Sequence, residues 1–252
     1  MKKILFLGFA GIIMLSGCAS EKQITKAEAY KGFYQEKPVT VLIMPPINRT
    51  ENVEAKDIFH STLSMPICNA GYYVIPPFLS MEILKRESAY DAELFLDAPL
   101  TKFGETFGAD LALFTIIDKW KKTTAIGKIN VEIEYIFKST KTNEIVYQRQ
   151  SNITLNPNIS YGFTPAGLII AAASTLESVI ANATTDNAIV GSMCNNHTLC
   201  DLPAGPYSPL NGKDGDLFAG KKEFKENISG KINENIVTGY LYSPYTKEKK
   251  KR

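Results

Sequence analysis

Residues 111–117 form a largely apolar run without a charged side chain near the middle of the chain. Such a run is typical of a strand that is covered on both faces of a sheet. In residues 129–137, apolar and polar side chains then alternate, which indicates a strand with one face in water. After a turn at residues 139–144, the stretch 145–154 is expected to pair back as a hairpin. This half of the chain therefore predicts a β-sheet.

The residues before this run alternate between strand and helix patterns. Residues 39–44 and 72–75 are short apolar stretches that each end at a pair of prolines, as buried strands do before a rigid loop. Residues 58–70, 80–86 and 100–107 carry apolar side chains at helical spacing, and Pro66 is expected to bend the first of these helices. The resulting order, β-α-β-α-β-β-β, predicts an α/β fold with a mixed sheet of about five strands and helices packed on it.

Composition and charge exclude several classes of protein. Hydrophobic residues make up 44% of the chain and charged residues 21%, which excludes disorder and collagen-like folds. The 28 Lys and Arg residues nearly balance the 26 Asp and Glu residues, so the formal net charge is only +2. Because nucleic-acid binders carry dense positive surfaces, we expect no nucleic-acid partner.

The amino terminus has the pattern of an export signal. Lys2 and Lys3 precede an apolar stretch, residues 4–15, that is shorter than the roughly 20 residues needed to span a bilayer. Leu-Ser-Gly-Cys follows at residues 15–18 and resembles the lipobox of bacterial lipoproteins, in which the cysteine thiol receives a diacylglycerol. We therefore predict lipidation of Cys18. The alternative is an ordinary secretory signal followed by a chance cysteine.

The expected location follows from the lipid. One acyl chain holds a protein weakly, whereas the two or three of a bacterial lipoprotein give a lasting anchor in the membrane. Ala19 and Ser20 follow Cys18, so the aspartate known as an inner-membrane retention signal is missing. By that analogy, the protein is lipid-anchored in the outer membrane and faces the periplasm.

The sequence divides into four predicted parts. Residues 1–17 form the signal peptide, and residues 18–38 are polar enough to serve as a lipidated tether. Residues 39–209 form the α/β domain, and residues 210–252 are an irregular extension with a basic tail. The tail is expected to be solvated, with docking on anionic headgroups as the alternative.

Residues 150–176 contain no charged side chain. Thr164 and Pro165 are suited to begin a helix there. Its apolar stripe would consist of Leu168, Ile169, Ala172, Leu176, Val179 and Ile180. Burial against the sheet, an interface with a partner or a second copy, and membrane insertion are the three interpretations, and the stripe is the candidate interface.

The remaining cysteines suggest one covalent link. In an oxidising periplasm, the short spacing of Cys194 and Cys200 predicts a disulfide, and Cys68 is expected to be a buried free thiol. Zinc is the alternative, because His197 lies between the two cysteines. These residues supply only three ligands, however, whereas structural zinc sites have four, so we expect no metal or other cofactor.

The sequence offers little to an enzyme mechanism. It has two histidines, His60 and His197, and lacks the H-E-x-x-H and G-x-S-x-G motifs and any glycine-rich phosphate loop. Lys-Asp-Gly-Asp at residues 213–216 lacks the spaced carboxylates of a calcium loop and predicts an exposed turn. We expect no enzymatic activity.

Three segments together carry a family resemblance. They are V-L-I-M-P-P-I-N-R-T at residues 41–50, F-G-A-D at residues 107–110 and L-P-A-G-P-Y-S-P at residues 202–209. With the lipobox, the chain resembles a family of bacterial lipoproteins that includes a neisserial surface-antigen candidate, over roughly residues 18–209. The resemblance implies a fold similar to the amino-terminal domain of TolB and, more loosely, to CsgG and LpoB. It implies no enzymatic activity.

These observations lead to two hypotheses about function. The first is a non-catalytic accessory or interaction module in envelope assembly or export; the family resemblance implies a CsgG-like secretion lipoprotein as a partner. The alternative is a pore-forming or translocation component similar to CsgG, which needs spanning hairpins of about 9 to 11 residues per strand. Within the chain, residues 150–161 are the only partial candidate for such a strand.

Overall fold

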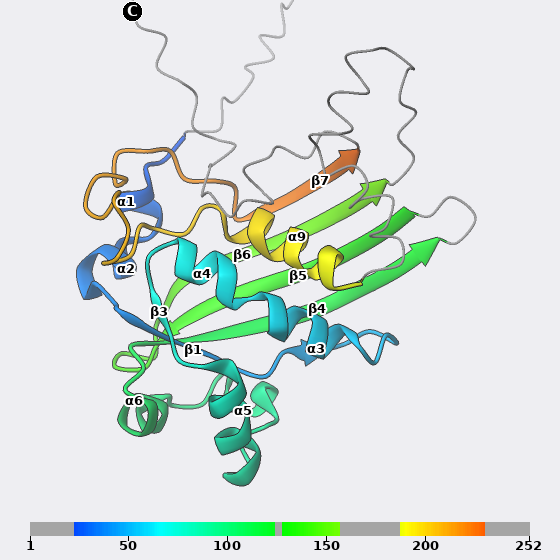
Figure 1. The fold of residues 1–252 in the computed structure, drawn as a ribbon. Helices are drawn as coiled ribbons and strands as arrows, with labels where there is room; N and C mark the ends of the chain where they lie inside the picture. Colours follow the sequence, from blue (N-terminus) through cyan, green and yellow to red (C-terminus); the bar gives the residue numbers. More distant parts are fainter. Residues whose placement is uncertain (1–22, 124–127, 157–186, 230–252) are drawn as a thin grey trace, which may run out of the picture.

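The computed structural model describes residues 23–123, 128–156 and 187–229, which form one mixed sheet with helices on both faces (Figure 1). The strands lie in the order β3-β1-β4-β5-β6-β7, and β2 pairs with the far end of β4. They are β1 (Thr40–Ile43), β2 (Ile47–Asn48), β3 (Tyr73–Val74), β4 (Leu111–Thr123), β5 (Lys128–Ser139), β6 (Ile145–Asn156) and β7 (Glu223–Ser229).

The helices surround this sheet in two layers. They are α1 (Lys26–Ala29), α2 (Lys31–Glu36), α3 (Ala55–Thr62), α4 (Ser64–Asn69), α5 (Pro77–Arg86), the 3-10 helix η1 (Ala92–Phe95), α6 (Thr101–Phe107) and α9 (Asn187–Leu199). Figure 1 shows α3, α4 and α9 on one face of the sheet, with α5 and α6 at the side of the sheet where β3 and β1 lie.

The predicted α/β fold class is confirmed, and the predicted order of strands and helices recurs within residues 40–156, but the described sheet has seven strands rather than about five because β2 and β7 were not predicted. β1 runs parallel to β3 and β4, whereas β4, β5 and β6 are antiparallel neighbours, so the sheet is mixed. All of residues 111–117 are buried, as expected for a strand covered on both faces. In β5 the apolar positions predicted by alternation, from Ile129 to Phe137, are buried, and Glu132 and Glu134 lie on the wetter face.

The sheet has a separate core on each face. The larger one joins apolar side chains of β4, β5 and β6 to Phe59, Leu63 and Val190. The smaller one joins Leu84 and Phe103 to residues of β1 and β4 on the opposite face. Because this second core includes little of β5 and nothing of β6, polar side chains on this face of those strands, such as Glu132, Glu134 and Gln150, remain partly in water.

The predicted helix over residues 58–70 is divided into α3 and α4. The division at Leu63 places Pro66 at the third position of α4. The first four amide groups of a helix have no intrahelical acceptor, so a proline there removes no hydrogen bond. The helix is therefore interrupted at Leu63, three residues before Pro66, and α4 continues through the proline.

The domain boundaries predicted from composition are too narrow at both ends. Residues 26–36 form α1 and α2 instead of a tether, and Tyr30 and Phe33 belong to the larger core. Residues 223–229 form β7, which pairs parallel to β6, instead of an irregular extension. Polar composition misled the prediction, since these short elements are stabilised by contacts with distant parts of the chain.

Candidate functional site

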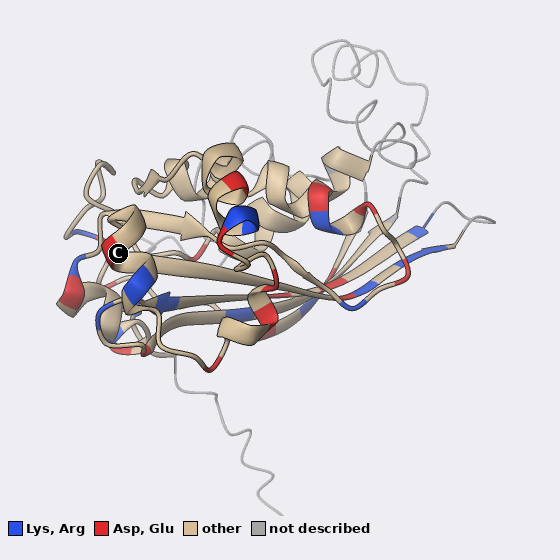
Figure 2. Cartoon of the chain, turned by 90° about the horizontal axis from the view of Figure 1, so that it is seen from below, with Lys and Arg blue, Asp and Glu red and all other residues tan. Residues whose placement is uncertain are grey.

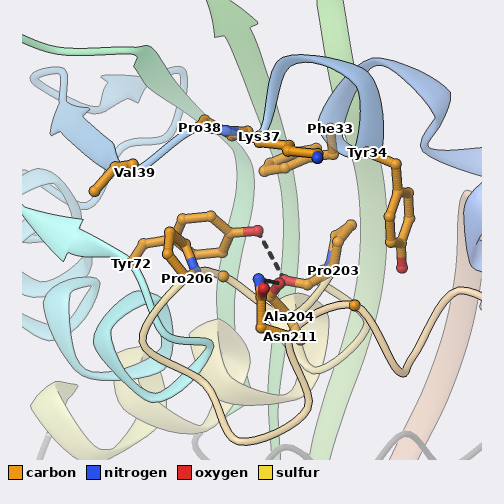
Figure 3. Close-up of a pocket in the computed structure, with 12 residues that line it drawn as sticks. Phe33, Tyr34, Lys37, Pro38, Val39, Tyr72, Pro203, Ala204, Pro206 and Asn211 are labelled. Carbon is orange, nitrogen blue, oxygen red and sulfur yellow. Dashed lines mark hydrogen bonds between the residues drawn. The ribbon is translucent and has the colours of Figure 1, made fainter.

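A pocket of about 310 Å³ lies between α2, the start of β3 and the loop after α9 (Figure 3). We call it the aromatic–proline pocket because aromatic residues and prolines make up half of its lining. Its lining consists of Phe33, Tyr34, Lys37, Pro38, Val39, Tyr72, Pro203, Ala204, Gly205, Pro206, Asn211 and Gly212.

The first wall forms where α2 turns into β1. Lys37 ends the helix in the left-handed conformation, with φ 47°, and its amide donates to the Phe33 carbonyl oxygen at 3.0 Å. The start of β1 is fixed by Asp110, whose carboxylate accepts from the amides of Val39 and Thr40 at 3.0 and 3.1 Å. The ammonium of Lys141 donates to the same carboxylate at 2.8 Å.

The opposite wall is a loop that packs directly on the α4–β3 turn. The Gly205 amide donates to the Ala70 carbonyl oxygen at 2.7 Å, and the Tyr207 amide donates to that of Gly71 at 3.0 Å. A Cβ at Gly205 would lie 2.4 Å from the Gly71 carbonyl oxygen, so this approach requires glycine. The Tyr72 hydroxyl closes the wall by donating to the Pro203 carbonyl oxygen at 2.8 Å (Figure 3).

A buried charge cluster joins this loop to α1. The Lys26 ammonium lies 3.7 Å from Asp201 and 3.9 Å from Asp214, and all three side chains are at most 5% exposed. The Tyr30 hydroxyl donates to Asp201, which also accepts from the Gly220 amide at 2.7 Å. Buried charges persist only when paired and hydrogen-bonded in this way, so the cluster fixes α1 to the loop.

The Tyr34 hydroxyl beside the pocket is buried and interacts with the carboxylate of Asp214, which lies outside the pocket lining. Burial, and then the negative charge of Asp214, raise the pKa of Tyr34, so its hydroxyl stays neutral. Burial likewise raises the pKa of Tyr72. The pocket therefore presents neutral phenols to an occupant.

The predicted disulfide is not formed. Cys194 and Cys200 are both buried free cysteines. Cys194 lies within α9 and Cys200 follows its end, and six residues of helix advance about 9 Å, beyond the roughly 7 Å limit for a disulfide between Cα atoms. The sequence spacing suggested proximity only because the helix was not predicted. Cys68 is free as expected, but it is exposed rather than buried.

His197 and Asp214 of the Lys-Asp-Gly-Asp segment have structural partners, whereas His60 Nε2 is buried without a hydrogen-bond partner among the described residues. His197 Nε2 lies 2.5 Å from Glu226 Oε2, and this hydrogen bond lowers the pKa of Glu226. Burial lowers the pKa of His60. Across residues 23–123, 128–156 and 187–229, no three His, Cys, Asp or Glu side chains gather as a metal site. Asp214 is 2% exposed, so the prediction of an exposed turn at residues 213–216 was wrong for this residue.

Two predicted sites lie outside the described residues. They are the lipidation site Cys18 and the stripe formed by Leu168, Ile169, Ala172, Leu176, Val179 and Ile180. Both stay predictions. Within the residues that the structure does describe, no helix combines the length and the apolar character that crossing a membrane requires. Figure 2 shows positions of Lys and Arg interspersed with positions of Asp and Glu along the described elements.

The family assignment comes from the comparison with known proteins. Residues 28–204 match a family described as "Putative lipoprotein GNA1162-like". The chain belongs to the GNA1162-like lipoprotein family. A relative from Neisseria meningitidis serogroup B, named "Putative lipoprotein NMB1124/NMB1162", is 26% identical over 188 residues, which cover 73% of this chain and 84% of the relative. The family resemblance seen in the sequence is thus confirmed.

Solved structures similar to this chain include a lipoprotein of the same family. The crystal structure of GNA1162 from Neisseria meningitidis has a TM-score of 0.44 and 22% identity, covering 57% of this chain and 99% of that one. A PelC dodecamer from Paraburkholderia phytofirmans has a TM-score of 0.34 and 11% identity, covering 52% and 80%. The likeness to TolB, CsgG and LpoB stays a prediction.

The segments that carried the resemblance have structural roles in this GNA1162-like protein. Residues 41–50 contain most of β1 and all of β2, and Asp110 of F-G-A-D fixes the start of β1. Residues 202–209 supply one wall of the aromatic–proline pocket. Sequence reasoning noted the prolines of this segment as the end of a domain and missed Tyr34, Tyr72 and Lys26, whose partners are distant along the chain.

Proposed function

We propose that this GNA1162-like lipoprotein is anchored in the outer membrane by acyl chains on Cys18, and that its periplasmic domain binds a segment of another envelope protein. The proposed binding site is the aromatic–proline pocket. One observation carries this proposal: a pocket of about 310 Å³ has walls of rings and prolines that are held together by the Gly205–Ala70 and Tyr72–Pro203 hydrogen bonds.

The size and chemistry of the pocket favour one or two side chains of a peptide segment. At about 310 Å³ it is at the small end of the range for small-molecule sites, roughly 300–1,000 Å³. Tyrosine rings offer a large contact area at a low cost in conformational entropy. An acidic group of the segment would meet the exposed ammonium of Lys37 at the rim.

The lining supports binding rather than catalysis. It contributes no carboxylate, imidazole or thiol side chain, and its two phenols are held neutral by burial. General acid–base chemistry near neutral pH uses groups whose pKa lies close to that pH. A role in envelope assembly or export, with a CsgG-like secretion lipoprotein as the first partner to test, is part of the same proposal.

Site-specific photocrosslinking tests this proposal in native envelopes. A photoreactive residue replaces Lys37 at the pocket rim of the full lipidated chain, and the control places it at Lys102, an exposed lysine of α6. We expect a discrete protein adduct from position 37 that is absent at position 102. Adding Tyr34→Phe, which removes only a hydroxyl, should reduce its yield. Equal adducts at both positions, or none at position 37, would refute the proposal.

A further inference from the structure

The described part of the chain begins close, in sequence, to the predicted lipidation site. The Ile24 carbonyl oxygen accepts a hydrogen bond from the Ala219 amide at 2.9 Å, and the Lys26 amide donates to the Leu217 carbonyl oxygen at 2.8 Å. The Lys26 side chain is then held in the buried charge cluster. The chain is therefore fixed to the domain from Ile24 onward.

This fixed point limits the distance between the domain and the bilayer. Ile24 is six residues after Cys18. A chain spans at most about 3.6 Å per residue, so Ile24 lies within roughly 22 Å of the lipidated residue. This step rests on the lipid anchor of the proposed function. It means that the surface around Ile24 stays beside the membrane for as long as the anchor is inserted.

That surface is hollowed and largely apolar. A shallow hollow of about 420 Å³ lies beside α1, and Ile24, Ala29, Ile145 and Val146 contribute apolar side chains to it. Ile24 is 43% exposed and Ile145 is 53% exposed. Lys222 also lines the hollow and has an exposed side chain. Exposed apolar side chains next to a cation match the layered chemistry of a phospholipid surface, which places phosphates outside acyl chains.

We propose that this face, which we call the Ile24–Ile145 face, lies against the phospholipid leaflet that holds the anchor. Ile24 and Ile145 enter the interfacial region, and the Lys222 ammonium meets lipid phosphates. Two exposed isoleucines are far less than the roughly 800 Å² per partner of a stable protein interface. A short tether removes most of the cost of association by keeping the local concentration of membrane high, so a small apolar face suffices.

Other exposed apolar side chains do not share this geometry. Phe78 is 84% exposed on α5. Figure 1 shows α5 at the opposite end of the molecule from α1 and from the first described residues. Exposure alone therefore does not identify the Ile24–Ile145 face as the membrane-facing surface. The face is identified by its position next to the residues that connect the domain to Cys18.

Fluorescence quenching in vesicles tests the inference. The full lipidated chain is reconstituted in phosphatidylethanolamine and phosphatidylglycerol with a quencher on the headgroups. Cys68, the exposed cysteine, is replaced by serine, and one fluorophore is attached at Ile145→Cys or, as the control, at Phe78→Cys. We expect quenching at position 145 to be at least threefold that at position 78. Adding Ile24→Glu and Lys222→Glu should lower it to the control value.

The outcomes distinguish a failure of this inference from a failure of the proposed function. Equal quenching at the two positions, with mass spectrometry showing lipid on Cys18, would overturn this inference and leave the anchor and the pocket proposal standing. Absence of lipid on Cys18 in native protein would overturn both the inference and the anchoring part of the proposed function. A protein adduct or a dimer formed through position 145 would also overturn the inference, because the face would then be occupied by a protein.

Discussion

The buried charge cluster should contribute strongly to stability through Lys26. Lys26→Met removes the cation but keeps most of the side-chain volume, leaving Asp201 and Asp214 at 0% and 3% exposure without their shared countercharge. Breaking a buried ion pair on one side typically costs about 3–5 kcal/mol. Asp201 keeps two hydrogen-bond donors, Tyr30 and Gly220, and Asp214 keeps the Ala204 amide, so we expect the lower end, about 3 kcal/mol.

Urea denaturation of an unlipidated chain beginning at Ala19 measures this effect. Unfolding is followed by circular dichroism and by the fluorescence of the single tryptophan, Trp120. In thermal unfolding, the same loss of about 3 kcal/mol in the free energy of unfolding corresponds to a decrease in Tm of roughly 6–12 °C for a chain of this size. The control is Lys31→Met, because Lys31 is exposed on α2 and should change stability by less than about 0.5 kcal/mol.

Equal stability of Lys26→Met and the parent chain would contradict this prediction. The charge cluster would then be solvated, or would not contribute to the free energy of unfolding. A double-mutant cycle refines the result. Lys26→Met combined with Asp201→Asn removes one of the stranded charges, so the double variant should lose less than the sum of the two single losses. Strict additivity would show that Lys26 and Asp201 do not interact.

Three further predictions concern single residues. Burial alone would raise the pKa of Asp110, but the hydrogen bonds from Lys141 and from the start of β1 outweigh it and lower this pKa. The contribution of Asp110 to the stability of the fold is therefore complete above about pH 5 and is lost as the pH falls through the lowered pKa. Asp110→Asn should cost about 1–2 kcal/mol at pH 7 and flatten the acid limb of a stability–pH curve. Cys68 should react with a thiol reagent in the native protein, whereas Cys194, whose pKa burial raises to about 12, should react only after unfolding. Gly71 has φ 92°, and a Cβ there would lie 2.4 Å from the backbone nitrogen of Ser208. In chemical denaturation, Gly71→Ala should therefore lower the free energy of unfolding by at least about 2 kcal/mol, which is more than for Gly108→Ala, whose Cβ position is open.

The central sheet could be predicted from the sequence because its signals are local. Alternation along residues 129–137 specifies which side chains are buried without reference to any other segment. Helices α1 and α2 have four and six residues and carry no such repeat. Isolated helices of this length are unstable in water, so only tertiary contacts such as those of Tyr30 and Phe33 explain them. β7 was not predicted either, because its charged residues are typical of a solvent-exposed segment rather than of a strand in a sheet.

The candidate site was harder to predict than the fold. Its walls come from residues 33–39, Tyr72 and residues 203–212, which are distant in the sequence. The prolines after Leu202 are typical of a domain boundary, and that interpretation concealed their role as a wall. The decisive contact is the approach of Gly205 to Gly71, which depends on two glycines about 130 residues apart and leaves no periodic pattern.

The buried charge cluster also connects the two surfaces that we propose. Lys26 follows the tether and contacts Asp214, and Asp214 accepts a hydrogen bond at 2.7 Å from the amide of Ala204 in the pocket wall. The other wall, with Tyr34, begins on the helix that directly follows α1. Because both walls are joined to α1 and α1 is joined to the tether, the aromatic–proline pocket has a fixed position relative to the Ile24–Ile145 face. A partner segment bound in the pocket would consequently lie at a set distance from the bilayer, which favours partners that are themselves held in the outer membrane.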